Sequence, residues 1–108
     1  MRTKSELPAC PVAAAVALIG GKWKLLILRN LRERPWRFNE LQRDLEGISQ
    51  KVLTDSLRQM VGDGLAYRRD YGQVPPRVEY GLTELGRKLL PILDALADFG
   101  NLYKSAAR

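Results

Sequence analysis

A capped, two-faced helix over residues 50–62 constrains the fold of this chain more than any other segment. Ser49 is a favoured N-cap residue, and Ile48 before it can pack on Leu53 at the spacing of a hydrophobic staple. Helical periodicity places the apolar Leu53, Leu57, Met60 and Val61 on one side, and Lys51, Thr54, Asp55 and Arg58 on the adjacent side. One face therefore belongs to a core, and the neighbouring polar face is exposed.

A β-hairpin is predicted directly after this helix. Gly62-Asp63-Gly64 ends the helix, and two strand-like runs, Leu65–Tyr71 and Arg77–Leu82, flank a loop of glycine, glutamine, valine and two prolines. Strand alternation puts Arg68 and Arg69 on opposite faces of the hairpin.

Three helical segments are expected before the capped helix. Pro11 suits the first turn of a helix over 11–19, with Cys10 at its N-cap. A second helix over 22–31 carries a broad apolar face, and residues 36–38 form a short strand or an extended link. Asn39 is expected to be the N-cap of a short helix that ends at Gly47. This helix would direct Leu41 and Leu45 toward the core.

The last helix begins after the cap residue Thr83, and its apolar residues recur at alternating spacings of four and three. Pro91 should kink or divide it, because proline cannot donate the helical hydrogen bond. A helix that is apolar on two sides needs two packing partners, so we expect one side to meet a second subunit. The expected dimer residues are Val16 on the first helix and Leu93, Leu96, Phe99 and Tyr103 on the last.

The order of these elements is that of a winged helix-turn-helix domain, mainly α with a small β-hairpin, dimerised through its terminal helices. A length of 108 residues suffices for one domain. Residues 1–9 are expected to form an N-terminal arm, 10–104 the domain with its dimerisation helices, and 105–108 a C-terminal tail.

The net charge and the scarcity of histidine and cysteine narrow the range of possible functions. Eighteen Lys and Arg against twelve Asp and Glu give a net charge of +6, which favours an anionic partner such as nucleic acid. No histidine and a single cysteine exclude His-based catalytic triads, Cys/His zinc sites and an internal disulfide, and no cofactor site is apparent. The apolar run 12–19 is too short to span a bilayer, so a cytoplasmic protein without a membrane partner is expected.

Several sequence blocks together resemble the HxlR-type family of bacterial winged helix-turn-helix transcription regulators. They are Cys10-Pro11-Val12, Ile19-Gly20-Gly21-Lys22-Trp23, Arg37-Phe38-Asn39-Glu40-Leu41, Gly47-Ile48-Ser49-Gln50-Lys51, Leu53-Thr54, Leu57-Arg58, Asp63-Gly64-Leu65, Pro75-Pro76-Arg77-Val78-Glu79-Tyr80 and Leu82-Thr83-Glu84-Leu85-Gly86. The resemblance implies a homodimer that binds a palindromic DNA operator, with a recognition helix in the major groove and the hairpin as a wing. Repression is the favoured direction of control, and activation stays open.

The candidate base-reading residues lie on the helix 50–62, whose first turns would approach base edges. They are Gln50, Lys51 and Thr54, with Arg58 for a phosphate or a guanine and Asp55 as a residue that orients Lys51 or Arg58. An ordinary solvated helix face is the alternative.

Phosphate contacts are expected from the wing and from the preceding helix. On the wing the candidates are Arg77 and one of Arg68 and Arg69, with local pairing of Arg77 to Glu79 or Asp70 as the alternative. Arg37 and Asn39 are candidates near the start of the preceding helix. The aromatic Trp23, Trp36 and Phe38 are expected in the core rather than as stacking platforms for single strands.

Cys10 is the candidate redox sensor. Some members of the family respond to oxidants or electrophiles through a cysteine that matches Cys10, and a helix N-terminus favours the thiolate. A small buried hydrophobic residue is the alternative. The rival for the whole chain is a winged-helix module that binds a protein, which the basic Lys51 and Arg58 disfavour.

Overall fold

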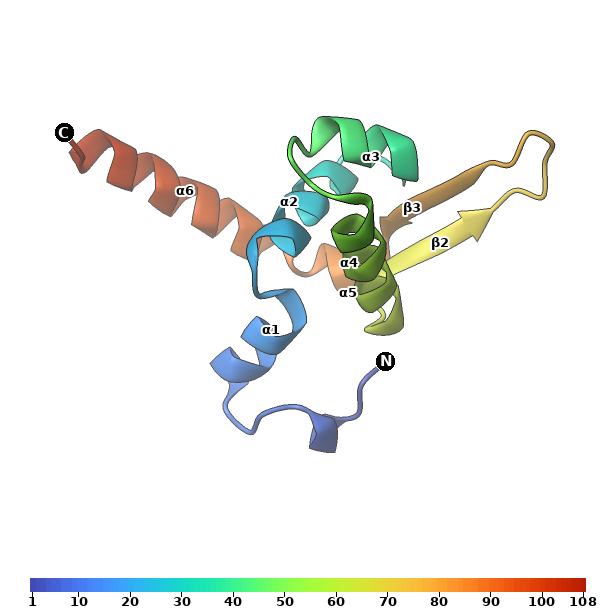
Figure 1. The fold of residues 1–108 in the computed structure, drawn as a ribbon. Coiled ribbons are helices and arrows are strands. Elements are labelled where there is room, and N and C mark those ends of the chain that lie inside the picture. The colour runs from blue at the N-terminus through green and yellow to red at the C-terminus, as the bar shows by residue number, and fades with distance from the viewer.

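The computed structural model describes residues 1–108, with helices around a small antiparallel sheet (Figure 1). The elements are η1 Lys4–Glu6, α1 Pro11–Ile19, α2 Lys22–Leu31, β1 Trp36–Arg37, α3 Phe38–Asp44, α4 Gln50–Gly62, β2 Ala66–Asp70, β3 Val78–Leu82, α5 Glu84–Arg87 and α6 Leu90–Ala106. The predicted fold, mainly α with a small β-hairpin, is confirmed.

The sheet contains one strand more than the predicted hairpin. β2 and β3 pair antiparallel, with Arg68 opposite Tyr80 and Arg69 opposite Glu79. β1 pairs with the other edge of β3, so the strand order is β1-β3-β2. Residues 36–37 are thus a strand rather than a free link, and their partner lies far along the chain.

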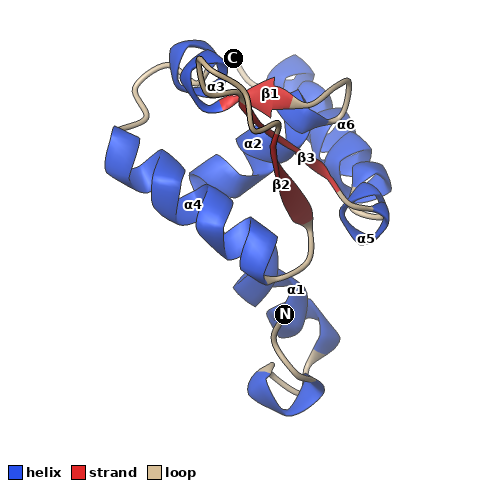
Figure 2. Cartoon of the chain, turned by 90° about the vertical axis from the view of Figure 1, so that its right-hand side faces the viewer, coloured by secondary structure: helices blue, strands red, loops and turns tan.

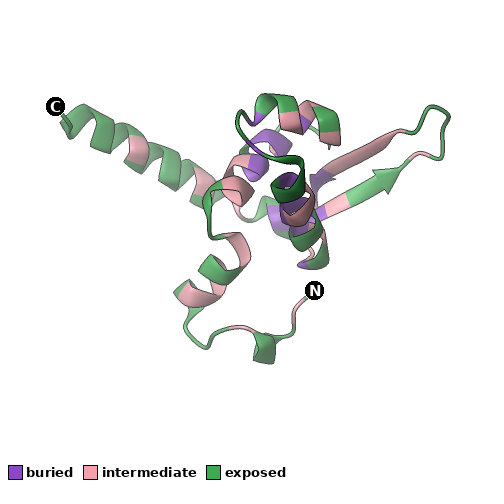
Figure 3. Cartoon of the chain, viewed as in Figure 1, coloured by how far each residue is buried: buried purple, intermediate pink, exposed green.

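The hydrophobic core lies where α2, α3 and α4 meet the sheet (Figure 3). Its largest fully buried side chains are Ile27, Leu28, Leu31, Leu41, Leu45, Leu53, Leu57 and Met60. Ile48 and Leu53, the predicted staple pair, both belong to this cluster. Trp23, Trp36 and Phe38 pack against it, as predicted for core aromatics.

Local hydrogen bonds fix both ends of α4. The Ser49 hydroxyl oxygen accepts a hydrogen bond from the Val52 backbone N–H at 3.1 Å, which confirms the predicted cap. At the other end Gly64 has φ +77°, a conformation that favours glycine, and the Leu65 N–H donates to the Met60 carbonyl at 2.9 Å. The chain therefore leaves α4 directly into β2 (Figure 2).

Helix α3 begins earlier than predicted, and the expected cap at Asn39 is wrong. Arg37 is the cap residue, and its backbone N–H donates to the Glu40 carboxylate at 2.8 Å. This contact from the third helical position back to the cap stabilises an earlier start, so Asn39 becomes an exposed residue inside the helix. The helix ends at Asp44, with Leu45 rather than Gly47 as its C-cap.

Pro91 divides the last helical region, as predicted. The Thr83 hydroxyl accepts from the Gly86 N–H at 3.0 Å and caps the short α5. Pro91 is the second residue of α6, where its missing N–H removes no helical hydrogen bond.

The terminal helices α1 and α6 project from the body of the molecule (Figure 1), and neither contains a buried residue. The first residues fold back, because the Arg2 guanidinium donates to both Asp63 carboxylate oxygens at 3.0 and 2.9 Å. The same guanidinium donates to the Ala17 carbonyl of α1 at 3.1 Å.

Taken alone, none of the helices has the length and apolarity to cross a bilayer; α1 and α2 meet that test only as a pair, across a bend of 76°.

Candidate nucleic-acid interface

Helix α4 presents the predicted polar face to solvent. Gln50, Lys51 and Arg58 are exposed, while Thr54 and Asp55 are half-buried. Since Leu53 and Leu57 on the other face are fully buried, the helix cannot rotate about its axis without exposing the core. The core thus fixes which residues α4 offers to a partner.

Lys51 and Asp55 form an ion pair one turn apart on this face. The Lys51 ammonium donates to an Asp55 carboxylate oxygen at 2.9 Å, and its side chain is 85% exposed. This hydrogen bond, and then the positive charge itself, lower the pKa of the Asp55 carboxyl. Asp55 therefore orients Lys51, one of the two roles expected for it.

A groove of about 220 Å³ separates α4 from the wing. It is lined by Thr54, Arg58 and Val61 of α4 and by Arg68 and Tyr80 of the two wing strands. The structure therefore brings Arg68 beside the predicted base-reading residues, although ten residues separate Arg58 from Arg68 in the chain. Two arginines at one groove form a local concentration of positive charge.

Arg69, Arg77, Tyr71 and Glu79 form a second cluster at the wing. The guanidinium carbons of Arg69 and Arg77 lie 4.8 and 4.2 Å from the Tyr71 ring centroid. Arg77 also donates to the Glu79 carboxylate at 3.3 Å, so the local pair named as its alternative is present. The Asp70 carboxylate instead accepts from the Gly72 N–H at 2.9 Å.

Hydrogen bonding shifts the pKa values of the two acidic groups in this cluster. A hydrogen bond with the Tyr71 hydroxyl is the main cause that lowers the pKa of the Glu79 carboxyl, and Arg77 lowers it further. The same hydrogen bond is the main cause that raises the pKa of Tyr71. Glu79 is therefore anionic and holds Arg77 against the tyrosine, close to the sheet.

The basic segment 22–37 is partly neutralised by acidic neighbours. Arg32 pairs with Asp94 and Arg34 with Glu40 at 3.4 Å, while Arg34 also lies over the Trp36 ring at 3.9 Å. Arg37 and Asn39 stay exposed at the start of α3. They do not line the groove between α4 and the wing.

The expected dimer residues are exposed with one exception. Val16, Leu96, Phe99 and Tyr103 are 59, 47, 62 and 66% exposed, whereas Leu93 is half-buried and packs against the core. The apolar residues Val12 of α1 and Ile92 and Leu102 of α6 are exposed as well and were not among the expected dimer residues. The apolar periodicity of the last helix could have predicted that Ile92 and Leu102 belong to its apolar side.

Cys10 is exposed at the N-cap of α1, and the alternative of a buried hydrophobic residue is wrong for it. The neighbouring residues Pro8, Ala9 and Pro11 are exposed as well. No group of three or more Cys, Asp and Glu side chains is placed to hold a metal ion.

Sequence reasoning also missed two features of this surface. Val52 lies at the first turn of α4 and is 37% exposed, so it offers an apolar side chain beside the polar ones. Arg2 and Asp63 join the N-terminal arm to the end of α4. No local pattern could signal that pair, since its partners lie 61 residues apart.

Comparison with known proteins gives a consistent result at three levels. Residues 18–108 match the family model of the HxlR-like helix-turn-helix. An uncharacterized HTH-type transcriptional regulator of Methanothermobacter thermautotrophicus is 49% identical over 96 residues, which is 89% of this chain and 73% of the relative. YdeP, an uncharacterized HTH-type transcriptional regulator of Bacillus subtilis, is 42% identical over 94% of this chain and 80% of its own length.

Solved structures of the redox regulator HypR are similar over nearly the whole chain. The oxidized form superposes with a TM-score of 0.82 at 41% identity, covering 92% of this chain and 98% of HypR. The reduced form superposes with a TM-score of 0.86 at 40% identity, covering 90% and 96%. The chain is thus similar to a regulator that has been observed in two redox states.

Proposed function

The chain belongs to the HxlR-like helix-turn-helix family of transcriptional regulators, and on that premise we propose that it binds a palindromic operator as a homodimer in the cytoplasm. One observation carries the proposal: the core fixes α4 so that its polar first turns and the wing residue Arg68 line one surface. A helix with exposed polar first turns is what major-groove recognition requires. The +6 net charge supports an anionic partner.

The proposed contacts divide into two kinds. Gln50, Lys51 and Thr54 read base edges in the major groove, with Asp55 holding Lys51 in place. Phosphate contacts come from Arg58 and Arg68 at the groove, Arg77 on the wing, and Arg37 and Asn39 on α3, while Arg69 lies on the opposite face of the hairpin from Arg68. To contact a phosphate, Arg77 releases the Glu79 carboxylate and binds the phosphate in its place. This exchange is possible because the Arg77–Glu79 pair is partly exposed.

The proposed dimer uses the projecting helices. Val16 and the exposed residues Leu96, Phe99 and Tyr103 of α6 form its centre, with Leu93 linking this surface to the core. A two-fold dimer of this kind presents two copies of α4 to half-sites about one helical turn, roughly 34 Å, apart.

Fluorescence anisotropy with a labelled duplex from the intergenic region beside its own gene, against a scrambled duplex, tests DNA binding over a salt series. We expect Lys51→Ala to lose about 1–3 kcal/mol of discrimination between the two duplexes. Arg77→Ala should weaken both and reduce the salt slope by about one. Lys104→Ala and Arg87→Ala, exposed and outside the proposed surface, are the matched controls. If the double variant Lys51→Ala/Arg77→Ala binds DNA like the wild type, this surface is not the DNA-binding site. The remaining hypothesis is then a winged-helix module that binds a protein.

Sedimentation equilibrium tests the dimer. Phe99→Glu places a charge in the middle of the exposed apolar surface and should shift the protein to monomer. Asn101→Glu, exposed on the same helix about half a turn away, is the matched control. Equal dimer content in both variants contradicts the proposed interface.

We also propose that an oxidant or electrophile controls DNA binding through Cys10. Its exposure allows reaction, and the similarity to HypR in oxidized and reduced forms supports redox control. With one cysteine per chain, the products are a disulfide between subunits, a mixed disulfide with a small thiol, or a sulfenic acid or adduct. If Cys10→Ser still loses operator binding after diamide treatment, Cys10 is not the sensor.

A further inference from the structure

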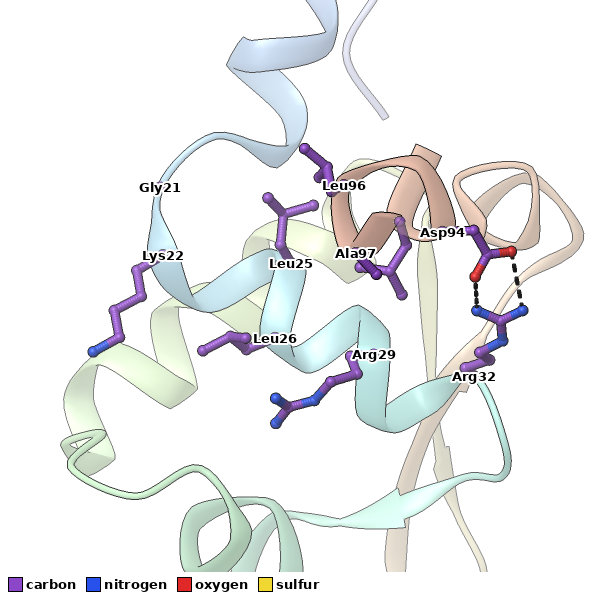
Figure 4. A pocket seen from close by; sticks show the side chains of 10 residues that line it. Gly21, Lys22, Leu25, Leu26, Arg29, Arg32, Asp94, Leu96 and Ala97 are labelled. Atoms are coloured by element: carbon purple, nitrogen blue, oxygen red, sulfur yellow. Dashed lines mark hydrogen bonds and ion pairs between the residues drawn. The ribbon is translucent and has the colours of Figure 1, made fainter. Parts of the chain in front are cut away.

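A pocket of about 440 Å³ opens between α2 and α6, remote from the groove between α4 and the wing (Figure 4). Its apolar lining comes from both helices and consists of Leu25, Leu26, Leu93, Leu96 and Ala97. The volume lies within the range of small-molecule sites, roughly 300–1,000 Å³. All the lining residues belong to one chain, and two of them, Leu93 and Leu96, are also part of the proposed dimer surface.

Three cationic side chains are among the residues that line this apolar pocket. Lys22 and Arg29 belong to α2, Arg32 is its C-cap residue, and Asp94 of α6 is the one acidic residue in the lining. Asp94 is bound by both terminal nitrogens of Arg32, as Figure 4 shows. That pair is neutral as a unit, which leaves Lys22 and Arg29 as the remaining positive charges of the lining.

Lys22 and Arg29 have room to accept an anion. Lys22 is exposed and lies over the Trp23 ring at 4.4 Å, with no carboxylate within ion-pair distance. Arg29 is 53% exposed, and its nearest carboxylate oxygen, on Asp44, lies 4.0 Å away, the limit of an ion pair. Neither charge is therefore fully compensated within the chain.

We propose that this pocket binds a compact amphipathic anion, an aromatic or branched aliphatic body that carries one carboxylate or sulfonate. The body would cover the leucines and Ala97, and the anionic group would face Lys22 and Arg29. Apolar walls with a few charged groups at the mouth are the usual composition of small-molecule sites.

The pocket lies at the joint between α6 and the rest of the domain. Leu90 and Leu93 are the α6 residues that pack against the core, and the Arg32–Asp94 pair is the salt bridge that ties α6 to α2. A ligand wedged between α2 and α6 would therefore change the angle at which α6 projects. The effect on half-site spacing rests on the proposed function, whereas binding itself does not.

Binding is tested on the full-length protein with a pair of probes that differ in charge. The probes are 8-anilinonaphthalene-1-sulfonate and its neutral analogue N-phenyl-1-naphthylamine, followed by fluorescence titration without DNA. We expect saturable binding of one sulfonate probe per chain, and about two- to fivefold weaker binding of the neutral one, because the cations are partly exposed. Absence of saturable binding, including occlusion of the pocket by a second subunit, overturns the proposal.

Variants locate the bound probe. Ala97→Phe fills the pocket and should raise the Kd of the sulfonate probe by about tenfold or more. Ala106→Phe, the same change on an exposed residue near the end of α6, should leave it unchanged. If both variants bind like the wild type, the probe binds elsewhere and the proposal is wrong.

A charge variant keeps the proposal testable if Ala97→Phe disturbs the fold. Arg29→Gln should weaken the sulfonate probe about two- to fivefold and leave the neutral probe unchanged, while Arg87→Gln should affect neither. An equal effect of Arg29→Gln on both probes contradicts the role of its charge. The DNA assay is separate, so failure here leaves operator binding standing.

Discussion

One hydroxyl group determines where the proposed recognition helix begins. The Ser49 side chain satisfies the Val52 N–H, one of the backbone donors that a helix leaves free at its first turn. Its backbone also joins the buried Ile48 to α4. The cap and the staple together therefore fix the direction in which α4 begins, and with it the direction in which Gln50 and Lys51 project.

Ser49→Ala should destabilise the protein by about 1 kcal/mol, because the Val52 N–H loses its acceptor. Urea denaturation measures this change. Ser105→Ala, at the exposed end of α6, should change stability by less than about 0.5 kcal/mol. Equal effects of the two substitutions would contradict the cap.

Glu40 has a comparable role at α3 and also titrates. The Arg37 N–H is the main cause that lowers the pKa of the Glu40 carboxyl, and Arg34 adds a smaller effect. A carboxyl with a lowered pKa contributes stability that is fully present above its unfolded pKa. That stability is lost as the pH falls through the folded-state pKa.

Glu40→Gln should therefore reduce the loss of thermal stability on acidification, because the amide still accepts a hydrogen bond but does not titrate. Melting temperatures of both proteins between neutral and acidic pH measure the effect. Glu46→Gln, an exposed carboxyl in the following turn, is the control and should keep the wild-type dependence. Parallel curves for the wild type and Glu40→Gln would refute the cap-linked titration.

At the scale of elements, the contact between α5 and the turn before β2 requires a residue without a side chain. A Cβ at Gly86 would collide with the Leu65 carbonyl oxygen, which already accepts from the Thr83 N–H at 3.2 Å. At Gly62, in the last turn of α4, a Cβ would meet nothing within 4 Å. The two positions should therefore respond oppositely to alanine.

Gly86→Ala should destabilise the fold by about 1–3 kcal/mol through overpacking. Gly62→Ala should stabilise it by up to about 1 kcal/mol, because alanine loses less backbone entropy in a helix. Denaturant unfolding of both variants gives the two signs. A stabilising Gly86→Ala would show that α5 can move away from β2 at little cost.

Elements set by neighbouring residues were predictable from the sequence, and contacts across the chain were not. Caps at Ser49 and Thr83 and the break at Pro91 rest on local hydrogen bonds, and all three are found. Asn39 failed as a cap because the Glu40 side chain, at the third helical position, accepts from the Arg37 N–H and stabilises a start two residues earlier. The β1–β3 pairing and the Arg2–Asp63 pair join distant residues, so no periodicity indicates them.

The candidate site shows the same limit. The exposed face of α4 was predictable from its 3.6-residue period, since Leu53 and Leu57 mark the opposite side. Which wing arginine faces α4 depends on the register of β2 against β3, and the structure selects Arg68. Local pairing of Arg77 with Glu79, two residues along the chain, was one of the alternatives from the sequence, and it is present.

At the scale of the whole molecule, the chain is more extended than a self-sufficient domain of its length. Its radius of gyration is 15.2 Å, against about 13 Å for a 100-residue globular domain. Only 17 of 108 residues are buried, and none of them lies in α1 or α6. These two projecting helices add to the size of the chain. Such helices are expected in a protomer that buries them against a second subunit.

The arm is held by one ion pair that joins three parts of the molecule, since Arg2 bonds Asp63 after α4 and Ala17 in α1. Arg2→Gln should release residues 3–9 and raise their amide exchange by about tenfold or more. Hydrogen-exchange mass spectrometry measures this, with the exposed Lys4→Gln as control. Unchanged exchange in the arm would show that other contacts hold it.

The bare surface of α6 links the stability of the fold to the abundance of the protein. In the proposed dimer, this helix of 17 residues with none buried would gain most of its packing from association, so mass action should raise the melting temperature as protein concentration rises. Calorimetry across a hundredfold dilution series, at about 1–100 μM, measures that slope. Newly made chains at low copy number would then be the least protected from proteases, and the cell would hold a threshold below which the regulator is cleared.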